Sequence, residues 1–237
     1  MARKFLTAEW QNLIMANYLI EPNMLKDYLP TGTELDLWNN RCYVSLVGFM
    51  FKKTKVLGMP IPFHRNFEEV NLRFYVRYKA ADEWRRGVVF VKEIVPKAMI
   101  TFVANTVYGE HYMTLPMKHD TISNLDKLEV AYYWKFQKEW NFIKASANPE
   151  ELPIPEGSEA EFITEHYWGY TRIKEGLTSQ YQVEHPRWNF YEVESHEIYC
   201  NAKPLYGDVF GECLSQEPVS VFMAKGSEII VRKAGKI

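Results

Sequence analysis

Cysteine is scarce in this chain: only Cys42, Cys200 and Cys213 occur in 237 residues, and no two form a C-x-x-C pair. An odd number of widely spaced cysteines does not build a disulfide framework, so the sequence predicts reduced thiols in a cytoplasmic protein. A basic excess is also missing, because 28 Lys and Arg stand against 30 Asp and Glu. We therefore expect no nucleic-acid partner.

Long apolar runs and cofactor motifs are missing as well. No stretch approaches the ~20 apolar residues that span a bilayer. Glu9, Gln11 and Asn12 interrupt the segment that follows Arg3 and Lys4, so neither a signal peptide nor a membrane partner is expected. The six histidines form no H-E-x-x-H pattern, and no Walker loop, nucleophile elbow or G-x-G-x-x-G motif occurs. The sequence therefore predicts no bound metal and no cofactor.

Aromatic residues, in contrast, are abundant at 15% of the chain. Aromatic and β-branched residues favour strands, and strand-like patterns recur along the chain at short spacing. They cover residues 10–20, 41–52, 67–78, 87–95, parts of 128–147, 166–174, 177–185, 190–199, 219–225 and 228–233. Many short strands predict an antiparallel barrel or sandwich, mainly β but of the α+β class, with a few short helices.

The connections between these strands point to one domain over residues 1–237. Short helices are predicted at 22–29, between Pro96 and Gly109, and from a Ser158 cap to Thr164. Residues 147–158, ANPEELPIPEGS, are rich in Pro and Glu and predict a long loop rather than a domain boundary. Residues 225–227 predict a hairpin turn.

The most informative strand covers residues 67–78. Glu69, Asn71 and Arg73 alternate with apolar residues, so all three point to the same sheet face. A carboxylate, an amide and a guanidinium on one barrel wall suit a polar or carboxylate-bearing ligand, since arginine offers a bidentate fork. The alternative is the solvent face of a half-buried strand.

Two further segments carry candidate residues. His111 and Tyr112 follow Gly109 and form a possible acid/base pair at a loop mouth, although a capped helix with a surface histidine explains the same pattern. His185 and Trp188 lie among aromatics that either line a ligand pocket or pack in the core. Lys92 lies in a strand and Lys97 at a helix start; a Schiff base would need one of them to be buried.

Several segments together resemble the YqjF-like family, a bacterial domain of unknown function in the acetoacetate decarboxylase-like superfamily. The strand Phe67 to Val76 resembles the family signature E-x-N-x-R-x-Y-V, and the glycine-led strand from Gly87 follows it at a suitable distance. The segment from Tyr108 to Tyr112, with Met117 after it, resembles the helix-end segment. The segments Phe162 to Tyr167 and His185 to Trp188 resemble the C-terminal motifs.

The resemblance implies an acetoacetate decarboxylase-like barrel, closed, conical and antiparallel, with an internal cavity. It favours the inward orientation of Glu69, Asn71 and Arg73. Decarboxylases of the superfamily carry a lysine pair after a glycine-led segment ending in proline. In this chain the similar position has Gly109-Glu110-His111-Tyr112, without lysine. Schiff-base decarboxylation is therefore not expected, because a fold does not carry chemistry without its site.

We interpret the chain as a cytoplasmic barrel protein that binds a small, acidic organic molecule. The predicted ligand-binding residues are Glu69, Asn71, Arg73, His111, Tyr112, His185 and Trp188. Two alternatives remain open. One is an enzyme that uses Glu69 and His111 as acid/base groups on a carbonyl or enol substrate. The other is a structural or interaction domain with a filled barrel. A homo-oligomer is compatible with either.

Overall fold

The computed structural model of the protein describes residues 3–81, 83–107 and 109–237. Its longest strands are β1 (Lys4–Leu19), β3 (Tyr43–Val56), β5 (Phe67–Ala80), β6 (Glu83–Val95), β10 (Glu139–Pro153) and β14 (Ser220–Arg232). The remaining strands are β2 (Thr33–Leu35), β4 (Met59–Pro60), β7 (Tyr112–Thr114), β8 (Met117–Ser123), β9 (Leu128–Phe136), β11 (Trp168–Lys174), β12 (Leu177–Glu184), β13 (Asn189–Tyr199) and β15 (Gly235–Lys236). The helices are the 3-10 helix η1 (Pro22–Tyr28), α1 (Ala98–Val107), α2 (Glu159–Thr164), α3 (Ala202–Tyr206) and α4 (Asp208–Leu214). The fold is mainly β with a few short helices, as the sequence predicts.

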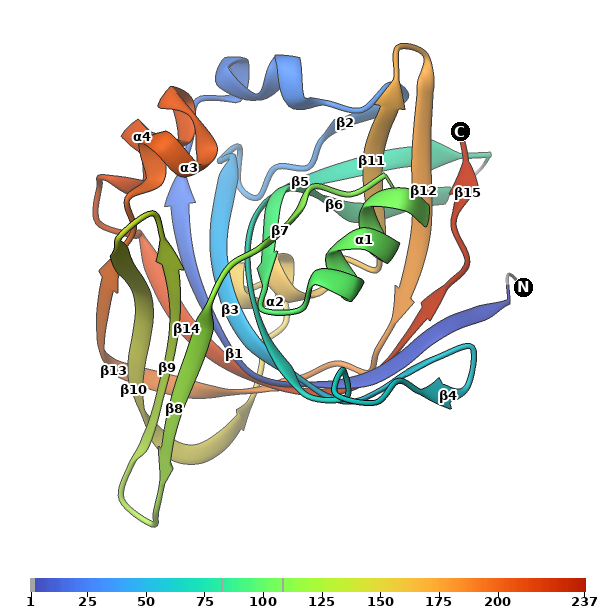
Figure 1. The fold of residues 1–237 in the computed structure, drawn as a ribbon. Coiled ribbons are helices and arrows are strands. Elements are labelled where there is room, and N and C mark those ends of the chain that lie inside the picture. The colour runs from blue at the N-terminus through green and yellow to red at the C-terminus, as the bar shows by residue number, and fades with distance from the viewer. Residues whose placement is uncertain (1–2, 82, 108) are drawn as a thin grey trace.

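The central strands form a ring (Figure 1). They pair in the order β12-β11-β6-β5-β3-β1-β14, and β14 pairs again with β12 through Val183–Val231 and Glu184–Ile230. Within this ring only the β11–β6 pairing is parallel. The path of paired strands therefore returns to its start, which leaves an interior that side chains line from every strand.

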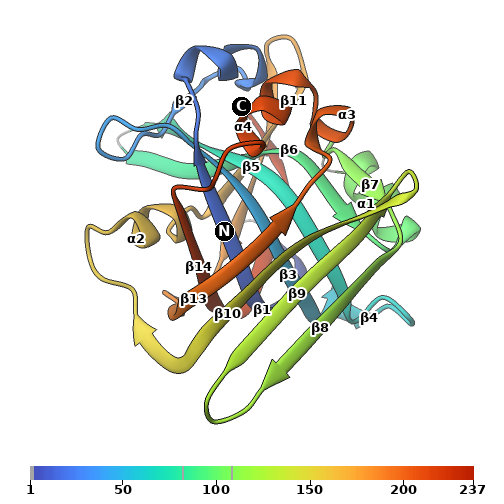
Figure 2. The ribbon, with the colours of Figure 1, turned by 90° about the vertical axis from the view of Figure 1, so that its left-hand side faces the viewer.

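A second layer covers the outside of the ring. From β14 the sheet continues through β13, β10, β9 and β8, which cross in front of β1 and β3 in Figure 2. Gly48 of β3 permits the close approach of the two layers, because a Cβ there would lie 2.7 Å from Cδ2 of Tyr132. The space between the layers is filled by a core cluster that includes Val44, Leu46, Val70, Leu72, Tyr132, Trp134 and Ile143.

The alternation of β5 explains which side chains reach the interior. Val70, Leu72 and Phe74 belong to the core between the layers. Their neighbours point the opposite way because successive side chains of a strand alternate between its faces. A second core cluster lies inside the ring and includes Leu13, Met15, Phe49, Phe51, Phe67, Tyr75 and Val88.

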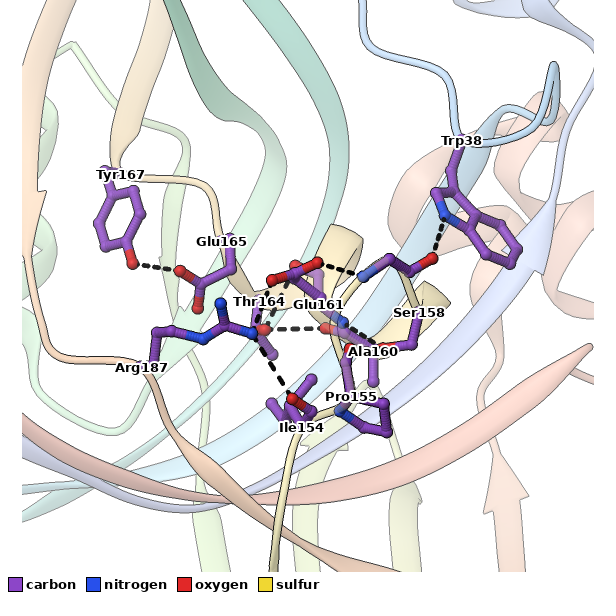
Figure 3. A network of polar contacts seen from close by, with 11 residues as sticks. Trp38, Ile154, Pro155, Ser158, Ala160, Glu161, Thr164, Glu165, Tyr167 and Arg187 are labelled. Carbon is purple, nitrogen blue, oxygen red and sulfur yellow. Dashed lines mark hydrogen bonds and ion pairs between the residues drawn. The ribbon is translucent and has the colours of Figure 1, made fainter.

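Short helices cover the two ends of the ring. α1 lies at the front in Figure 1 and α2 at the back, as the turned view of Figure 2 shows. Ser158 caps the start of α2, because its Oγ accepts a hydrogen bond from the Glu161 backbone N–H at 3.1 Å, so the predicted cap is confirmed. The Glu161 carboxylate accepts a bond from the Gly157 N–H at 2.6 Å and pairs with Arg187 at 2.6 Å (Figure 3). Trp38 Nε1 donates to the Gly157 carbonyl at 3.3 Å, which ties the start of α2 to the loop before β3.

Two predicted connections are wrong. Residues 147–158 are not one loop, because β10 continues to Pro153, which pairs with Asn189. The register shifts between Ala147 and Glu151, so the Asn-Pro-Glu segment bulges out and the missing N–H of Pro149 breaks no ladder bond. Residues 225–227 form no hairpin turn: Gly226, with φ +81°, pairs with Gln11 inside the continuous strand β14.

The short elements α3, α4, β7 and β8 were not predicted from the sequence. In the described part of the chain, no helix has the length and apolar character needed to cross a membrane.

Candidate functional site

The ring encloses a cavity of about 190 Å³. Its wall is mostly apolar and includes Phe49, Phe51, Phe67 and Phe90. Residues of α1 close one side, and Met99, which lines the cavity, is 58% exposed. The cavity therefore reaches the surface beside α1. An enclosed, largely apolar space with a few polar groups is typical of a small-molecule site.

Three residues of β5 form a polar wall of this cavity. Glu69, Asn71 and Arg73 all line it and are 2%, 1% and 8% exposed. The predicted shared inward face is confirmed, and the alternative of a solvent face is wrong. Asn71 Nδ2 donates a hydrogen bond to Glu69 Oε1 at 3.0 Å, so the amide and the carboxyl act as one unit.

Tyr112 completes this wall from a different element. β7 pairs parallel with β6, which places Tyr112 opposite Glu93, and the phenol donates to Glu69 Oε2 at 3.1 Å. Asn105 of α1 fixes the Tyr112 backbone, donating to its carbonyl at 3.0 Å and accepting from its N–H at 2.8 Å. The predicted site residue Tyr112 therefore lies in the cavity and contacts Glu69.

Sequence reasoning missed two acidic residues of the site, Glu93 and Glu110. Both line the cavity and are 2% and 6% exposed. Glu93 Oε2 and both carboxyl oxygens of Glu110 are buried and form no hydrogen bond of regular geometry with the described residues, although the hydroxyl groups of Thr171 and Tyr181 lie near enough to lower the pKa of Glu110. The available signal was a single carboxylate within the apolar strand GVVFVKEIV and another directly after the helix-ending Gly109.

A β-bulge decides that Glu93 faces the cavity. Leu72 pairs with Lys92 and Arg73 pairs with Phe90, so Val91 is an extra residue in β6. Without this bulge, alternation from Phe90 would turn Lys92 inward. Instead the Lys92 ammonium donates to the Leu205 carbonyl and lies 5.9 Å from the Tyr206 ring centroid. Neither Lys92 nor Lys97 is among the described residues that line the cavity.

Burial controls the protonation of the three carboxyl groups. Burial raises the pKa of Glu69 to about 7, although hydrogen bonds from Asn71 and Tyr112 oppose the shift. Burial also raises the pKa of Glu110 to about 7, and it raises the pKa of Glu93 well above the usual range, helped by repulsion from Glu110. A cluster of this kind holds protons near neutral pH, so it can donate hydrogen bonds to a ligand oxygen or exchange a proton with it.

His185 and Trp188 belong to a smaller compartment of about 30 Å³. Arg73 lines both this compartment and the main cavity, so the two spaces meet at its side chain. The His185 ring stacks on Trp188 with centroids 4.3 Å apart, and Trp188 Nε1 donates to Ser227 Oγ at 2.8 Å. Burial lowers the pKa of His185, which favours a neutral ring.

His111 is the predicted residue that the structure does not bring to the others. Its side chain is exposed, its Nδ1 lies 3.5 Å from the Phe90 carbonyl oxygen, and it lines neither space. It is therefore not placed to share a ligand with Glu69. Tyr108, which belongs to the same predicted motif, lies outside the described residues. Over the described ranges, no group of three His, Cys, Asp or Glu has the arrangement of a metal site.

Sequence comparison gives one family and one relative. The sequence model of DUF2071, described as an uncharacterized conserved protein, matches residues 7–228. The uncharacterized protein YqjF of Bacillus subtilis (strain 168) is 25% identical over 224 residues, which cover 93% of this chain and 88% of that protein.

Structural comparison places the chain among acetoacetate decarboxylase-like folds. The acetoacetate decarboxylase of Legionella pneumophila superposes with a TM-score of 0.67 at 12% identity, over 98% of this chain and 87% of that chain. The enduracididine biosynthesis enzyme MppR complexed with pyruvate gives a TM-score of 0.64 at 12% identity, over 100% and 90%. An acetoacetate decarboxylase-like enzyme from Sphingomonas wittichii RW1 gives 0.66 at 10% identity, over 99% and 94%. At these identities the likeness establishes the fold.

Proposed function

The chain belongs to the DUF2071 family of uncharacterized conserved proteins, and we propose that its barrel binds a small organic acid with an apolar body. The observation that carries this proposal is the cavity of about 190 Å³, whose wall is mostly apolar and includes Arg73. A guanidinium forms strong, charge-assisted hydrogen bonds to carboxylates where water is excluded. The three free cysteines accord with a cytoplasmic location.

The chemistry of this site differs from that of a lysine Schiff base. Tyr112 and Glu110 occupy the segment where the resemblance to decarboxylases would require lysine, and a phenol forms no imine. A related fold binds pyruvate in MppR, which supports a small carboxylate as the class of ligand. The properties of the cavity thus support a small carboxylate as the ligand, whereas decarboxylation through a lysine is not proposed for this protein.

The test is a titration of straight-chain carboxylates from acetate to octanoate by isothermal calorimetry. Each methylene buried in an apolar cavity contributes about 0.8 kcal/mol, or roughly fourfold in affinity, until the cavity is full. Two variants of α1 provide the comparison. Ala104 lines the cavity, so Ala104→Trp should fill it and abolish binding. Ala98 begins the same helix, is exposed and lies outside the lining, so Ala98→Trp should bind as wild type does.

Two results would contradict the proposal. One is the absence of any chain-length dependence. The other is unchanged binding in Ala104→Trp, since a ligand in the barrel cannot share that space with an indole ring.

A second function, acid–base catalysis on a carbonyl or enol substrate, is favoured by one observation. Burial raises the pKa of Glu69 to about 7 in the same cavity, so this group can accept and return a proton near neutral pH. Glu110, rather than the exposed His111, is the partner within the cavity. Solvent exchange provides the test: with 2-oxohexanoate in deuterium oxide, wild-type protein should label carbon 3, and Glu69→Gln should not.

A further inference from the structure

The smaller compartment behind Arg73, which we call the Arg73 compartment, differs from the main cavity in charge. It is lined by Trp10, Arg73, Phe90, His166, Trp168 and His185, among others. Of the described residues that line it, none is Asp or Glu, whereas Glu69, Glu93 and Glu110 line the main cavity. Arg73 is the only arginine or lysine among the described residues of this lining, so an anionic group in the compartment meets a positive charge with no carboxylate to compete for it.

Three residues that line this compartment each carry a buried polar atom that finds no hydrogen-bond partner among the described residues: Arg73 Nε, Trp10 Nε1 and His166 Nδ1. Arg73 and His166 are each 8% exposed. One Arg73 Nη2 bond to the Ile163 carbonyl, at 3.4 Å, holds the guanidinium in place but leaves Nε–H unused. Buried polar groups are normally satisfied, so three orphan atoms around one small space indicate a site for a polar group.

The contacts of His166 define which kind of group fits its orphan nitrogen. Nε2 lies 3.1 Å from Asp36 Oδ2, and Arg86 Nε donates to the same oxygen at 2.6 Å. Since a carboxylate held by an arginine is an acceptor, Nε2 carries the proton of the neutral ring. Burial lowers the pKa of His166 to about 4, which keeps the ring neutral. Nδ1 is therefore an acceptor that needs a donor from the ligand.

The residues that line the compartment thus supply two unused N–H donors, on Arg73 and Trp10, and one unused acceptor, on His166. Two donors beside a fixed positive charge match the oxygens of a carboxylate. The acceptor matches a hydroxyl next to that carboxylate. Its size agrees, because a space of about 30 Å³ holds roughly two or three water-sized groups.

From this arrangement we infer that the Arg73 compartment binds the head group of a 2-hydroxy carboxylate. The carboxylate accepts from Arg73 Nε and Trp10 Nε1, and the 2-hydroxyl donates to His166 Nδ1. The apolar body passes Phe90 into the main cavity, toward the carboxyl cluster. This inference rests on the proposed function, since it assigns the orientation and class of the acid that the barrel binds.

The first measurement uses wild-type protein and ligands that differ only in the head group: each enantiomer of 2-hydroxyhexanoate, hexanoate and 1,2-hexanediol. Calorimetry near neutral pH should show one 2-hydroxyhexanoate enantiomer binding about 5- to 10-fold more tightly than hexanoate, from one added hydrogen bond. The diol, which lacks the charge, should bind about 10- to 100-fold more weakly than that enantiomer. Equal affinities for the acid and the diol would overturn the inference without any variant.

The second measurement separates the two contacts. Arg73→Met keeps an unbranched side chain and removes the guanidinium. It should bind both hexanoate and 2-hydroxyhexanoate about 10- to 100-fold more weakly than wild type does. Arg77→Met, on the same strand with a side chain that is 42% exposed, is the matched control and should bind as wild type does. His166→Gln keeps an N–H toward Asp36 and loses the ring acceptor. It should therefore abolish the preference for the hydroxy acid while hexanoate binds as before.

The outcomes distinguish this inference from the proposed function. If hexanoate binds wild type and Arg73→Met equally, the barrel binds acids but the head group lies elsewhere, and the inference is overturned alone. If His166→Gln keeps the preference for the hydroxy acid, the assignment of the hydroxyl is wrong. If no carboxylate binds wild-type protein, both the inference and the proposed function are overturned.

Discussion

The phenol of Tyr112 donates a hydrogen bond of 3.1 Å to Oε2 of Glu69, joining β7 to β5 in the wall of the cavity. Because both groups are buried, the bond stabilises the ionised carboxylate in a place where water cannot. It also turns the phenol oxygen of Tyr112 toward the carboxyl group. The bond from Tyr112 therefore opposes the rise in the pKa of Glu69 that burial causes.

Replacing Tyr112 by phenylalanine should raise the pKa of Glu69 further, since one donor to its carboxylate is lost. We expect Tyr112→Phe to lower the free energy of unfolding by about 1–2 kcal/mol at mildly alkaline pH. Urea unfolding followed by circular dichroism measures this loss. Tyr199→Phe is the matched control, because Tyr199 makes the same 3.1 Å bond to Glu139 at the exposed surface. A surface pair of this kind contributes about 0.5 kcal/mol or less, so equal losses in both variants would contradict the buried role.

The carboxyl cluster should make the protein less stable as the pH rises. Glu110 has a pKa of about 7 in the folded protein, above its ordinary value of 4.5. The folded state therefore binds more protons than the unfolded state between pH 4.5 and about 7. Its stabilising effect is complete below the unfolded pKa and is lost as the pH passes through about 7, by about 1.4 kcal/mol per pH unit for each proton.

In wild-type protein the free energy of unfolding should fall between about pH 5 and 8. In Glu110→Gln this fall should be smaller by about 2 kcal/mol. Denaturant unfolding across this range measures the slope. Glu156→Gln, at an exposed loop position, should leave the slope unchanged. A wild-type protein whose stability rises over the same range would show that the three carboxyl groups are not desolvated.

Below about pH 6.5, His166 should have the opposite effect: it makes the protein less stable as the pH falls. Its pKa is lowered to about 4, from 6.5. Between these two pH values the folded state binds fewer protons than the unfolded state, so the folded state loses stability as the pH falls from 6.5 to about 4. His166→Gln should make the melting temperature less dependent on pH between about 4 and 6.5. The exposed His196→Gln serves as the control. If the melting temperature of His166→Gln depended on pH between about 4 and 6.5 as that of the wild type does, His166 would be protonated in the folded protein.

Substitution of Gly226 by alanine would test the close contact between β14 and β1. A Cβ at Gly226 would lie 2.1 Å from the Trp10 carbonyl oxygen, whereas Gly58, with a similar φ of +83°, has open space around it. Gly58→Ala should cost about 1 kcal/mol from its backbone conformation alone. Gly226→Ala should cost at least about 2 kcal/mol more, because the backbone of β1 must move. Similar costs in thermal unfolding would argue against this packing of the ring.

The protein should form no Schiff base with a keto acid. Lys92 turns away from the cavity toward the Leu205 carbonyl, and Lys97 lies outside its lining. Incubation with acetoacetate or pyruvate, reduction with borohydride and mass spectrometry should give no stoichiometric adduct. An adduct on one lysine, abolished by mutating that lysine, would restore decarboxylase-type chemistry as the leading hypothesis.

Local sequence patterns predicted much of the fold and part of the site. The alternation in β5 gave the shared face of Glu69, Asn71 and Arg73, because side-chain direction in a regular strand depends only on parity. It did not give the role of Glu93, because the bulge at Val91 changes parity within β6. Gly226 was mistaken for a turn since the same glycine signal marks a tight turn and a close approach of two strands.

By itself, the sequence determined the elements that local chemistry controls: the strands, the cap at Ser158, the family resemblance and the polar face of β5. Only the tertiary structure decided which residues meet. It brought Glu110 and Tyr112 against Glu69, left His111 at the surface, and placed His166 behind Arg73 with an unsatisfied nitrogen. The physical reason is that pKa, burial and hydrogen-bond satisfaction depend on neighbours distant in sequence, and strand pairing and bulges choose those neighbours.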